Sequence, residues 1–216
     1  APHPDNVYED WNHDFAPAKK MMIRALNYWL TEYKVDGFRM DLSHGLCGTT
    51  YDAMEHITDY YEKGVKAVAE DAYFILEHWG PQMSSERPKL VNQGMLCWDN
   101  TTNAYYQTAM GWLKDGDSFD GNEKDCFFGA NKDGYVSYCE SHDEERMQYK
   151  CTQYGNGDIK TKESVRLGRV AANVAFNVLL NGSHMLWQFE EIGYDFSINC
   201  DVDNPTAYDS GKRCNT

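Results

Sequence analysis

The stretch "VDGFRMDLSHG", residues 35–45, decides how the fold is interpreted, because it combines an apolar strand pattern with charged side chains. Side chains alternate between the two faces of a strand, which predicts one apolar and one polar face. The apolar face would hold Phe38, Met40 and Leu42, and the polar face Arg39, Asp41 and Ser43. Charged groups are rarely buried unless they are paired. Taken alone, the stretch predicts either a structural ion pair or part of a functional site.

Composition and charge narrow the class of protein. The chain has 216 residues, 42% of them hydrophobic and 14% aromatic, which is enough to bury a core. Its 34 acidic and 20 basic residues give a formal net charge of −14. This balance disfavours nucleic acid as a partner, because binding to phosphates requires basic residues.

Membrane and export signals are also missing from the sequence pattern. No apolar run reaches the ~18 residues of a membrane-spanning helix. The first residues, "APHPDNVYEDWNHDF", have neither the basic start nor the apolar stretch of a signal peptide. The sequence itself therefore predicts no membrane-spanning segment and leaves the compartment open.

Seven cysteines are scattered along the chain, without a C-x-x-C motif or a Cys/His cluster. Zinc binding is not expected from this spacing, and no metal ligands are assigned. Cys97 and Cys139 lie in apolar, strand-like stretches, where we expect them to be small buried hydrophobic residues.

Helical and strand patterns alternate along the chain. Apolar residues at helical spacing predict helices over residues 14–34, around 49–72 and over 162–181, and Pro17 lies near the start of the first. Strand candidates start at Val35 and lie within 73–80, 95–98, 134–146 and 183–195. This alternation predicts a parallel sheet, either in a barrel or in an open doubly wound fold.

Three of the strand candidates deliver a carboxylate at their C-terminal end: Asp41, Glu77 and Asp143. Ligands bind at this edge of parallel α/β folds. Glu77 comes 36 residues after Asp41, and Asp143 comes 66 residues after Glu77, against about 30 for one strand-helix-strand unit. We therefore expect Asp41 and Glu77 on neighbouring strands, with Asp143 two strands further on. Neighbouring strands, about 4.8 Å apart, suit the roughly 5 to 5.5 Å between the two carboxyl groups of retaining glycosidases.

Three motifs in this order also carry a family resemblance. They are "GFRMD" followed by a basic residue three positions later, "ILEHWG" and "ESHDEER". They resemble the second, third and fourth conserved regions of the alpha-amylase superfamily, glycoside hydrolase family 13. "MLWQFEEIGYD" resembles the eighth-strand segment of amylase-like enzymes from gut Bacteroidetes. The resemblance implies an α/β fold that is a partial TIM (β/α)8 barrel, approximately strands four to eight with their helices.

The resemblance assigns roles to five residues. Asp41 would be the nucleophile, Glu77 the general acid/base, and Asp143 the third acid, which grips sugar hydroxyls. Arg39 would orient the nucleophile and keep it charged, and His142 would bind the sugar in the cleavage subsite. Independently of the family, a guanidinium favours an ionised carboxylate and an apolar surround favours a protonated one.

Other positions carry weaker assignments. His44 stands where many family members have lysine, so it would contact sugar on the aglycone side or be a solvated loop histidine. Trp79 follows an acid and would stack on a sugar face, although a core position is the default for an aromatic residue. Glu190 and Glu191 are expected in a solvated loop, with no role.

The function implied by the resemblance is retaining hydrolysis of α-1,4-glucans, such as starch and maltooligosaccharides, through a covalent glycosyl-aspartate intermediate. Cleavage of α-1,6 bonds, glucan branching or transglycosylation, and a non-catalytic glucan-binding half-barrel remain open. An unrelated nucleotide-binding α/β protein is the other alternative, and it would require a glycine-rich turn between a strand and a helix. The glycine-containing segments "GNGDIK" and "KDGDSFDG" lack this strand-turn-helix setting.

The resemblance also indicates how much of a complete barrel the chain contains and which cofactors are expected. A complete barrel takes about 250 residues, so residues 1–216 are expected to form a single, incomplete catalytic domain. The first three strands, the inserted domain and the C-terminal β-domain would be absent, and the isolated chain would be poorly soluble or inactive. The residues require no cofactor. The resemblance leaves Ca²⁺ open, together with a secreted or periplasmic location.

Overall fold

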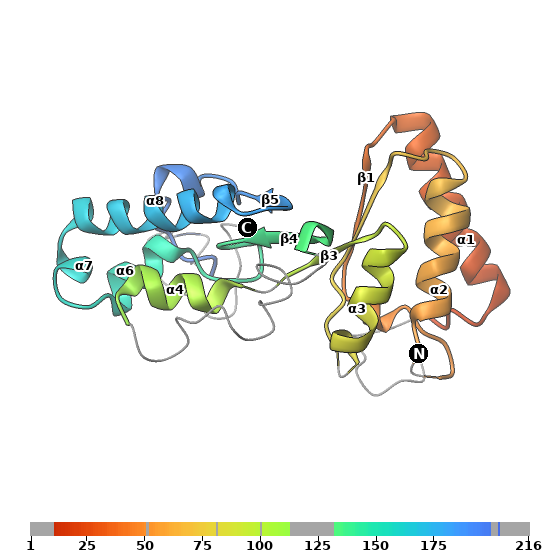
Figure 1. Cartoon of the computed structure of the whole chain (residues 1–216), viewed down its shortest axis with the longest axis horizontal. Helices are drawn as coiled ribbons and strands as arrows, with labels where there is room; N and C mark the ends of the chain where they lie inside the picture. The colour runs from red at the N-terminus through yellow and green to blue at the C-terminus, as the bar shows by residue number, and fades with distance from the viewer. Residues whose placement is uncertain are drawn as a thin grey trace. The chain divides into compact units, whose positions relative to one another are not determined.

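The computed structural model describes residues 11–50, 52–80, 82–99, 101–112, 132–199 and 203 (Figure 1). The chain divides into two compact units, Ala1–Trp98 and Asp99–Thr216. The predicted single-domain organisation stays a prediction.

The first unit contains three parallel strands, β1 (Gly37–Met40), β2 (Tyr73–Leu76) and β3 (Leu96–Trp98). β1 pairs with β2 in a register that sets Met40 opposite Leu76, and β2 pairs with β3. The predicted parallel pairing of the strands that precede Asp41 and Glu77 is therefore confirmed.

Six helical elements accompany these strands. They are α1 (Ala16–Tyr28) with its π-helical continuation η1 (Trp29–Tyr33), the short 3₁₀ helix η2 (Ser43–Gly45), α2 (Met54–Asp59) with its π-helical continuation η3 (Tyr60–Lys66), and α3 (Met83–Asn92). Pro17 lies in the first turn of α1, as expected. The sequence did not predict α3, because Pro88 lies inside it and proline normally interrupts a helix.

The strand predicted from Val35 is shorter than its alternation pattern suggests. β1 ends at Met40, and Leu42 has a left-handed backbone with φ of 42°. Leu42 is exposed while Ser43 is buried, so their predicted faces are wrong. The reason is that the chain turns into η2, where the two-residue period of a strand no longer applies.

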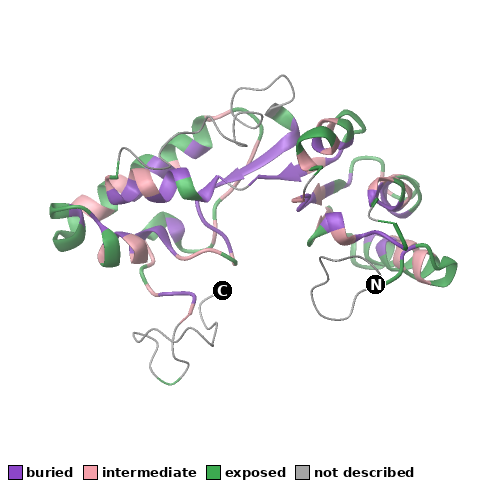
Figure 2. Cartoon of the chain, turned by 90° about the horizontal axis from the view of Figure 1, so that it is seen from below, coloured by how far each residue is buried: buried purple, intermediate pink, exposed green. Residues whose placement is uncertain are grey.

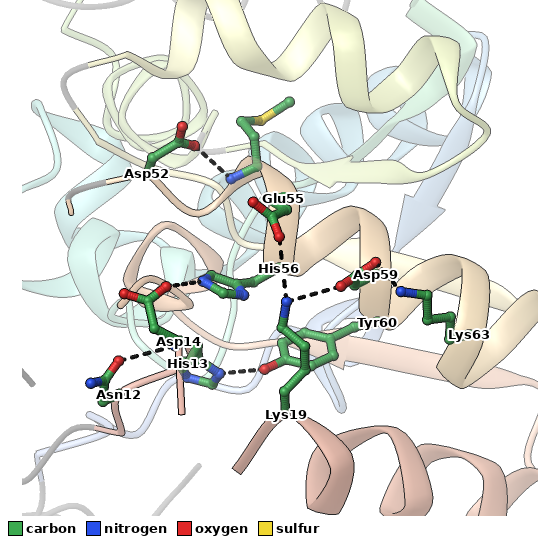
Figure 3. A network of polar contacts seen from close by, with 11 residues as sticks. Asn12, His13, Asp14, Lys19, Asp52, Glu55, His56, Asp59, Tyr60 and Lys63 are labelled. Atoms are coloured by element: carbon green, nitrogen blue, oxygen red, sulfur yellow. Dashed lines mark hydrogen bonds and ion pairs between the residues drawn. The ribbon is translucent and has the colours of Figure 1, made fainter. Parts of the chain in front are cut away.

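A polar network joins the start of α1 to α2 and η3 (Figure 3). Lys19 Nζ lies 2.9 Å from Asp59 Oδ2, and a 2.6 Å hydrogen bond joins His13 Nδ1 to the Tyr60 hydroxyl. Beside these polar contacts, Leu26 and Leu30 are the buried residues of α1 and η1. The network and the two leucines together fix the helix layer of the first unit.

The second unit has two described parallel strands, β4 (Tyr135–Tyr138) and β5 (Ser183–Met185), with Ser137 opposite His184. Its helices are α4 (Thr102–Met110), η4 (Lys132–Gly134), α6 (Met147–Tyr154), α7 (Asp158–Thr161), α8 (Glu163–Leu179) and η5 (Glu190–Ile192). The predicted helix over 162–181 is confirmed as α8. The strand candidate over 183–195 is mostly wrong, because β5 ends at Met185 and η5 follows.

Burial differs among the strands (Figure 2), since every residue of β1 and of β5 is intermediate in exposure. All four residues of β4 are buried. Cys97 and Cys139 are fully buried, which confirms their interpretation as small core residues. Within the described part of the chain, no helix combines the length and apolar character needed to cross a membrane.

Candidate active site

The ends of β1 and β2 bring two carboxyl groups together in the first unit. The register that pairs Met40 with Leu76 places Asp41 and Glu77 directly after paired strand ends. The backbone continues this pairing, since Glu77 N–H donates to Met40 O at 3.0 Å and Ser43 N–H donates to Glu77 O at 2.9 Å. Asp41 and Glu77 thus follow neighbouring strands, as predicted.

Arg39 joins both carboxyl groups. Its Nη1 donates a hydrogen bond to Asp41 Oδ1, and its Nη2 lies 3.0 Å from Glu77 Oε1. The second Glu77 oxygen, Oε2, accepts a 2.7 Å hydrogen bond from the Leu42 N–H. The Arg39 guanidinium also lies over the Trp98 ring, 5.1 Å from its centroid. The ion pair expected from the sequence therefore exists, and it includes Glu77 as a third member.

The two carboxyl groups differ in environment. The Asp41 side chain is 68% exposed, whereas the Glu77 side chain is 3% exposed. Burial raises the pKa of Glu77 above its ordinary value; the Leu42 N–H and the Arg39 charge oppose this rise, and the Asp41 carboxylate adds to it. The site therefore combines a solvent-accessible carboxylate with a buried carboxyl group that retains its proton to higher pH.

His44 and Trp79 follow Asp41 and Glu77 closely in the sequence, and each forms a hydrogen bond through a ring nitrogen. His44 is buried, and its Nε2 donates to Gln82 Oε1 at 3.1 Å. The alternative of a solvated loop histidine is therefore wrong. Trp79 is half-buried and donates from Nε1 to Trp98 O at 3.1 Å. Contacts of either side chain with sugar stay predictions.

The third predicted acid belongs to the second unit. Asp143 lies in the loop that follows β4 and is exposed. Its Oδ2 lies 3.2 Å from Nε2 of His142, and its backbone N–H donates to the buried Ser141 hydroxyl. The His142 ring lies 6.0 Å from the Trp187 ring. The second unit therefore presents an adjacent acid and imidazole at the end of β4.

The second unit also contains a buried group of charged residues, Glu140, Arg146 and Glu190, that the sequence did not predict. Arg146 Nη1 donates to Glu140 Oε1 at 2.9 Å, and Glu140 Oε2 accepts from the Met147 N–H at 2.6 Å. Glu190 is 2% exposed, so its assignment to a solvated loop is wrong. It accepts a hydrogen bond from the Trp187 N–H across a tight turn. Burial, reinforced by the charge of Glu140, raises the pKa of Glu190 to about 8.

Two further features of the site were not predicted from the sequence. The Leu42 N–H is a main-chain group, and no residue type signals it. The spacing of Glu140 and Arg146 within "ESHDEER" was the available signal for their pair.

The described residues offer no evident metal centre. Among them, no group of three or more His, Cys, Asp or Glu side chains is placed to hold a metal ion. Hard cations such as Ca²⁺ need several oxygen ligands. Calcium binding therefore stays an expectation from the resemblance, with no ligands assigned.

Comparisons with known proteins show a likeness in fold. No family model matches the chain, and no curated protein matches it. Among solved structures, a product complex of a multi-modular glycogen-degrading pneumococcal virulence factor matches over 97% of this chain, with a TM-score of 0.69 and 13% identity. An Anoxybacillus alpha-amylase matches over 94%, with a TM-score of 0.63 and 12% identity. A Klebsiella pneumoniae pullulanase complexed with maltotriose matches over 89%, with a TM-score of 0.58 and 21% identity.

These matches define the fold of the chain. The chain spans 25%, 41% and 23% of the length of those three structures. The predicted class is confirmed: an α/β fold whose parallel strands and helices match part of the catalytic barrel of alpha-amylases and pullulanases. At these identities the likeness establishes the fold alone, and the activity has to be argued from the site.

Proposed function

We propose that this chain carries the nucleophile and the acid/base of a retaining glycoside hydrolase of family 13 that acts on α-1,4-glucans. The observation that carries the proposal is the bridge made by Arg39 between an exposed carboxylate, Asp41, and a buried carboxyl group, Glu77. Retaining glycosidases need two carboxyl groups close together in unlike environments.

The proposed reaction has two steps. Asp41 attacks the anomeric carbon to form a covalent glycosyl-aspartate while Glu77 gives its proton to the departing glycosidic oxygen. Glu77, now ionised, then takes a proton from the water that releases the sugar. Each step inverts the anomeric centre, so the product retains the configuration of the substrate.

Arg39 accounts for how Glu77 reaches the leaving oxygen. Glu77 Oε1 faces Arg39 and Oε2 accepts from Leu42, so neither oxygen is directed at a ligand in this state. A protonated Glu77 attracts the guanidinium less than a carboxylate does, while Asp41 remains an alternative partner for it. In the proposal, Arg39 shifts toward Asp41 and Glu77 Oε1 turns to the substrate.

The remaining residues have supporting roles in the proposal. Asp143 grips sugar hydroxyls and His142 binds the sugar at the cleavage site; their adjacency after β4 suits a shared task. Trp79 offers one partly exposed ring face beside Glu77. The burial of His44 favours a role in holding its loop over direct contact with sugar. By resemblance the chain would supply strands four to eight of a barrel similar to those of Bacteroidetes amylases.

A second substrate is supported by the comparisons. Pullulanases are among the matched structures, and one of them is a complex with maltotriose. Pullulan, and with it α-1,6 cleavage, is therefore the alternative to test beside maltooligosaccharides. Transglycosylation would appear as longer products, and a glucan-binding half-barrel as binding without turnover.

The experiment uses Glu77→Gln in the complete gene product that carries this chain, with α-maltosyl fluoride as substrate. Fluoride departs without a proton, so the first step proceeds, whereas release of the sugar lacks its base. We expect a maltosyl adduct on Asp41, detected by intact mass and peptide mapping. Glu62→Gln, at an exposed position of η3, is the matched control and should accumulate none. An adduct at another residue, or its persistence in Glu77→Gln with Asp41→Asn, would refute the assignment.

A further inference from the structure

Behind Glu77 lies a group of polar side chains that the proposed reaction does not use. We call it the His78 cluster, and it comprises Ser43, His44, His78, Gln82 and Glu86. Its members come from η2, from the segment after β2, and from the start of α3. His78 is fully buried, and its ring lies 5.3 Å from that of His44.

The partners of His78 define its proton positions. Glu86 Oε2 lies 2.9 Å from His78 Nε2, and a carboxylate can only accept, so Nε2 carries the proton. Burial lowers the pKa of His78, against the opposing pull of Glu86, which favours the neutral ring. In the neutral ring Nδ1 is an acceptor, so the Ser43 hydroxyl, 3.2 Å away, donates to it.

These bonds fix the turn that follows β1. Ser43 is held through its backbone N–H by Glu77 O and through its hydroxyl by His78. His44 is held by Gln82, and its ring lies so near Gly80 that a Cβ there would come within 2.6 Å of Nδ1. Leu42, with its left-handed φ of 42°, precedes this turn. Such a conformation in a non-glycine residue persists only where the surroundings enforce it.

We propose that His78 and Glu86 are positioning residues, which hold the Leu42–His44 turn so that the Leu42 N–H stays directed at Glu77 Oε2. Neither side chain would touch substrate. The inference rests on the proposed role of Glu77 for its functional meaning, because the turn presents a hydrogen-bond donor to the acid/base. It predicts that weakening the cluster acts on Glu77 through Leu42.

The test compares Glu86→Ala with Glu86→Gln. Alanine removes the acceptor for His78 Nε2–H, whereas glutamine keeps an acceptor oxygen and should rescue the geometry. Lys89→Ala, at an exposed position further along α3, is the control. Two readouts on the 216-residue chain need no turnover: hydrogen exchange of the Leu42 amide, and the pKa of Glu77 from its ¹³C carboxyl shift.

We expect Glu86→Ala to speed Leu42 exchange by about tenfold or more. The loss of the Leu42 hydrogen bond, which favours ionised Glu77, should raise the Glu77 pKa by about one unit. The charges facing Glu77, Arg39 and Asp41, are unchanged in these variants. Glu86→Gln and Lys89→Ala should leave both readouts near those of the unsubstituted chain.

The outcomes separate this inference from the proposed function. Unchanged Leu42 exchange and Glu77 pKa in Glu86→Ala would overturn the inference, even if the complete protein hydrolyses α-glucans. Shifted readouts without hydrolysis by the complete protein would support the positioning role and refute the proposed function. If Glu86→Ala fails to fold, Ser43→Ala takes its place: it removes the hydroxyl bonded to His78, and the same two shifts are expected.

Discussion

Asp41 and Glu77 occupy equivalent places after paired strands but differ in exposure. The Asp41 side chain is open to solvent, whereas the Glu77 side chain is buried and accepts a hydrogen bond from the Leu42 N–H. Because burial raises the pKa of Glu77, this carboxyl group keeps its proton to higher pH than it would in solvent. Arg39 couples them because it forms an ion pair with both. At the scale of single residues, Arg39 is therefore the group whose loss should affect both steps of the proposed reaction.

Replacing Arg39 by alanine removes a cation that lowers the Glu77 pKa, so we expect that pKa to rise. The turnover number of the complete protein should fall by roughly 10²-fold or more, because the nucleophile and the acid lose their orientation. Arg39→Lys should restore charge but not the bridge, since an ammonium lacks the planar fork of a guanidinium. The pH dependence of kcat measures both effects, and an Arg39→Ala enzyme with an unaltered profile would contradict the bridging role.

Glu190 gives a prediction for stability against pH. Its pKa is about 8 in the folded chain against a reference value of 4.5, so the folded state binds more protons between these pH values. The free energy of unfolding should therefore lose a contribution as pH rises from about 4.5 through 8. Glu190→Gln removes that loss, so the variant should gain stability relative to the parent at pH 9 compared with pH 5.

Urea unfolding of the 216-residue chain at both pH values tests this expectation. Glu191→Gln is the matched control, because Glu191 is the exposed neighbour in the same 3₁₀ helix. An equal change in both variants would show that burial does not raise the pKa of Glu190.

The residues of the candidate site were only partly predictable. Asp41, Glu77 and Arg39 could be found because charged residues interrupt apolar strand patterns at their ends. Glu190 was misassigned because an acidic dipeptide after a strand gives no sign that one of its members is covered. His78 was passed over, because its role depends on Glu86, which lies in the unpredicted helix α3.

At the scale of elements, helices and strands were predicted where apolar periodicity was strong, as in α8, β2 and β3. The misses have physical causes. Helix α3 was not predicted because Pro88 lies inside it, and β1 is shorter than predicted because the chain turns at Leu42. Tertiary contacts impose these features, and local propensity does not encode them.

The contact between the segment before α1 and η3 gives an element-scale prediction. Tyr60→Phe removes the hydroxyl that bonds His13 Nδ1 within the core of the first unit. We expect the free energy of unfolding to fall by about 1 kcal/mol. Tyr28→Phe, at an exposed position of α1, should change it little. If both variants match the parent in urea unfolding, the hydrogen bond does not contribute to stability.

At the scale of the whole molecule, the fold matches part of larger amylase and pullulanase structures, and apolar surface is exposed on α8. Leu179 is 83% exposed, with Phe176 and Val178 exposed nearby. Contiguous apolar patches promote association. We expect the isolated 216-residue chain to self-associate with rising concentration, and Leu179→Lys to reduce this in sedimentation velocity. A monomeric parent chain at all concentrations would contradict the expectation.

We propose that Asp41 and Glu77 catalyse α-glucan hydrolysis with retention. The most direct measurement is ¹H NMR of the anomeric protons during the first minutes of maltooligosaccharide hydrolysis by the complete gene product, with Asp41→Asn as the control. We expect the α-anomer to form first and the β-anomer to appear only by mutarotation, with no product from Asp41→Asn. First formation of the β-anomer, or undiminished hydrolysis by Asp41→Asn, would refute catalysis with retention by these two residues.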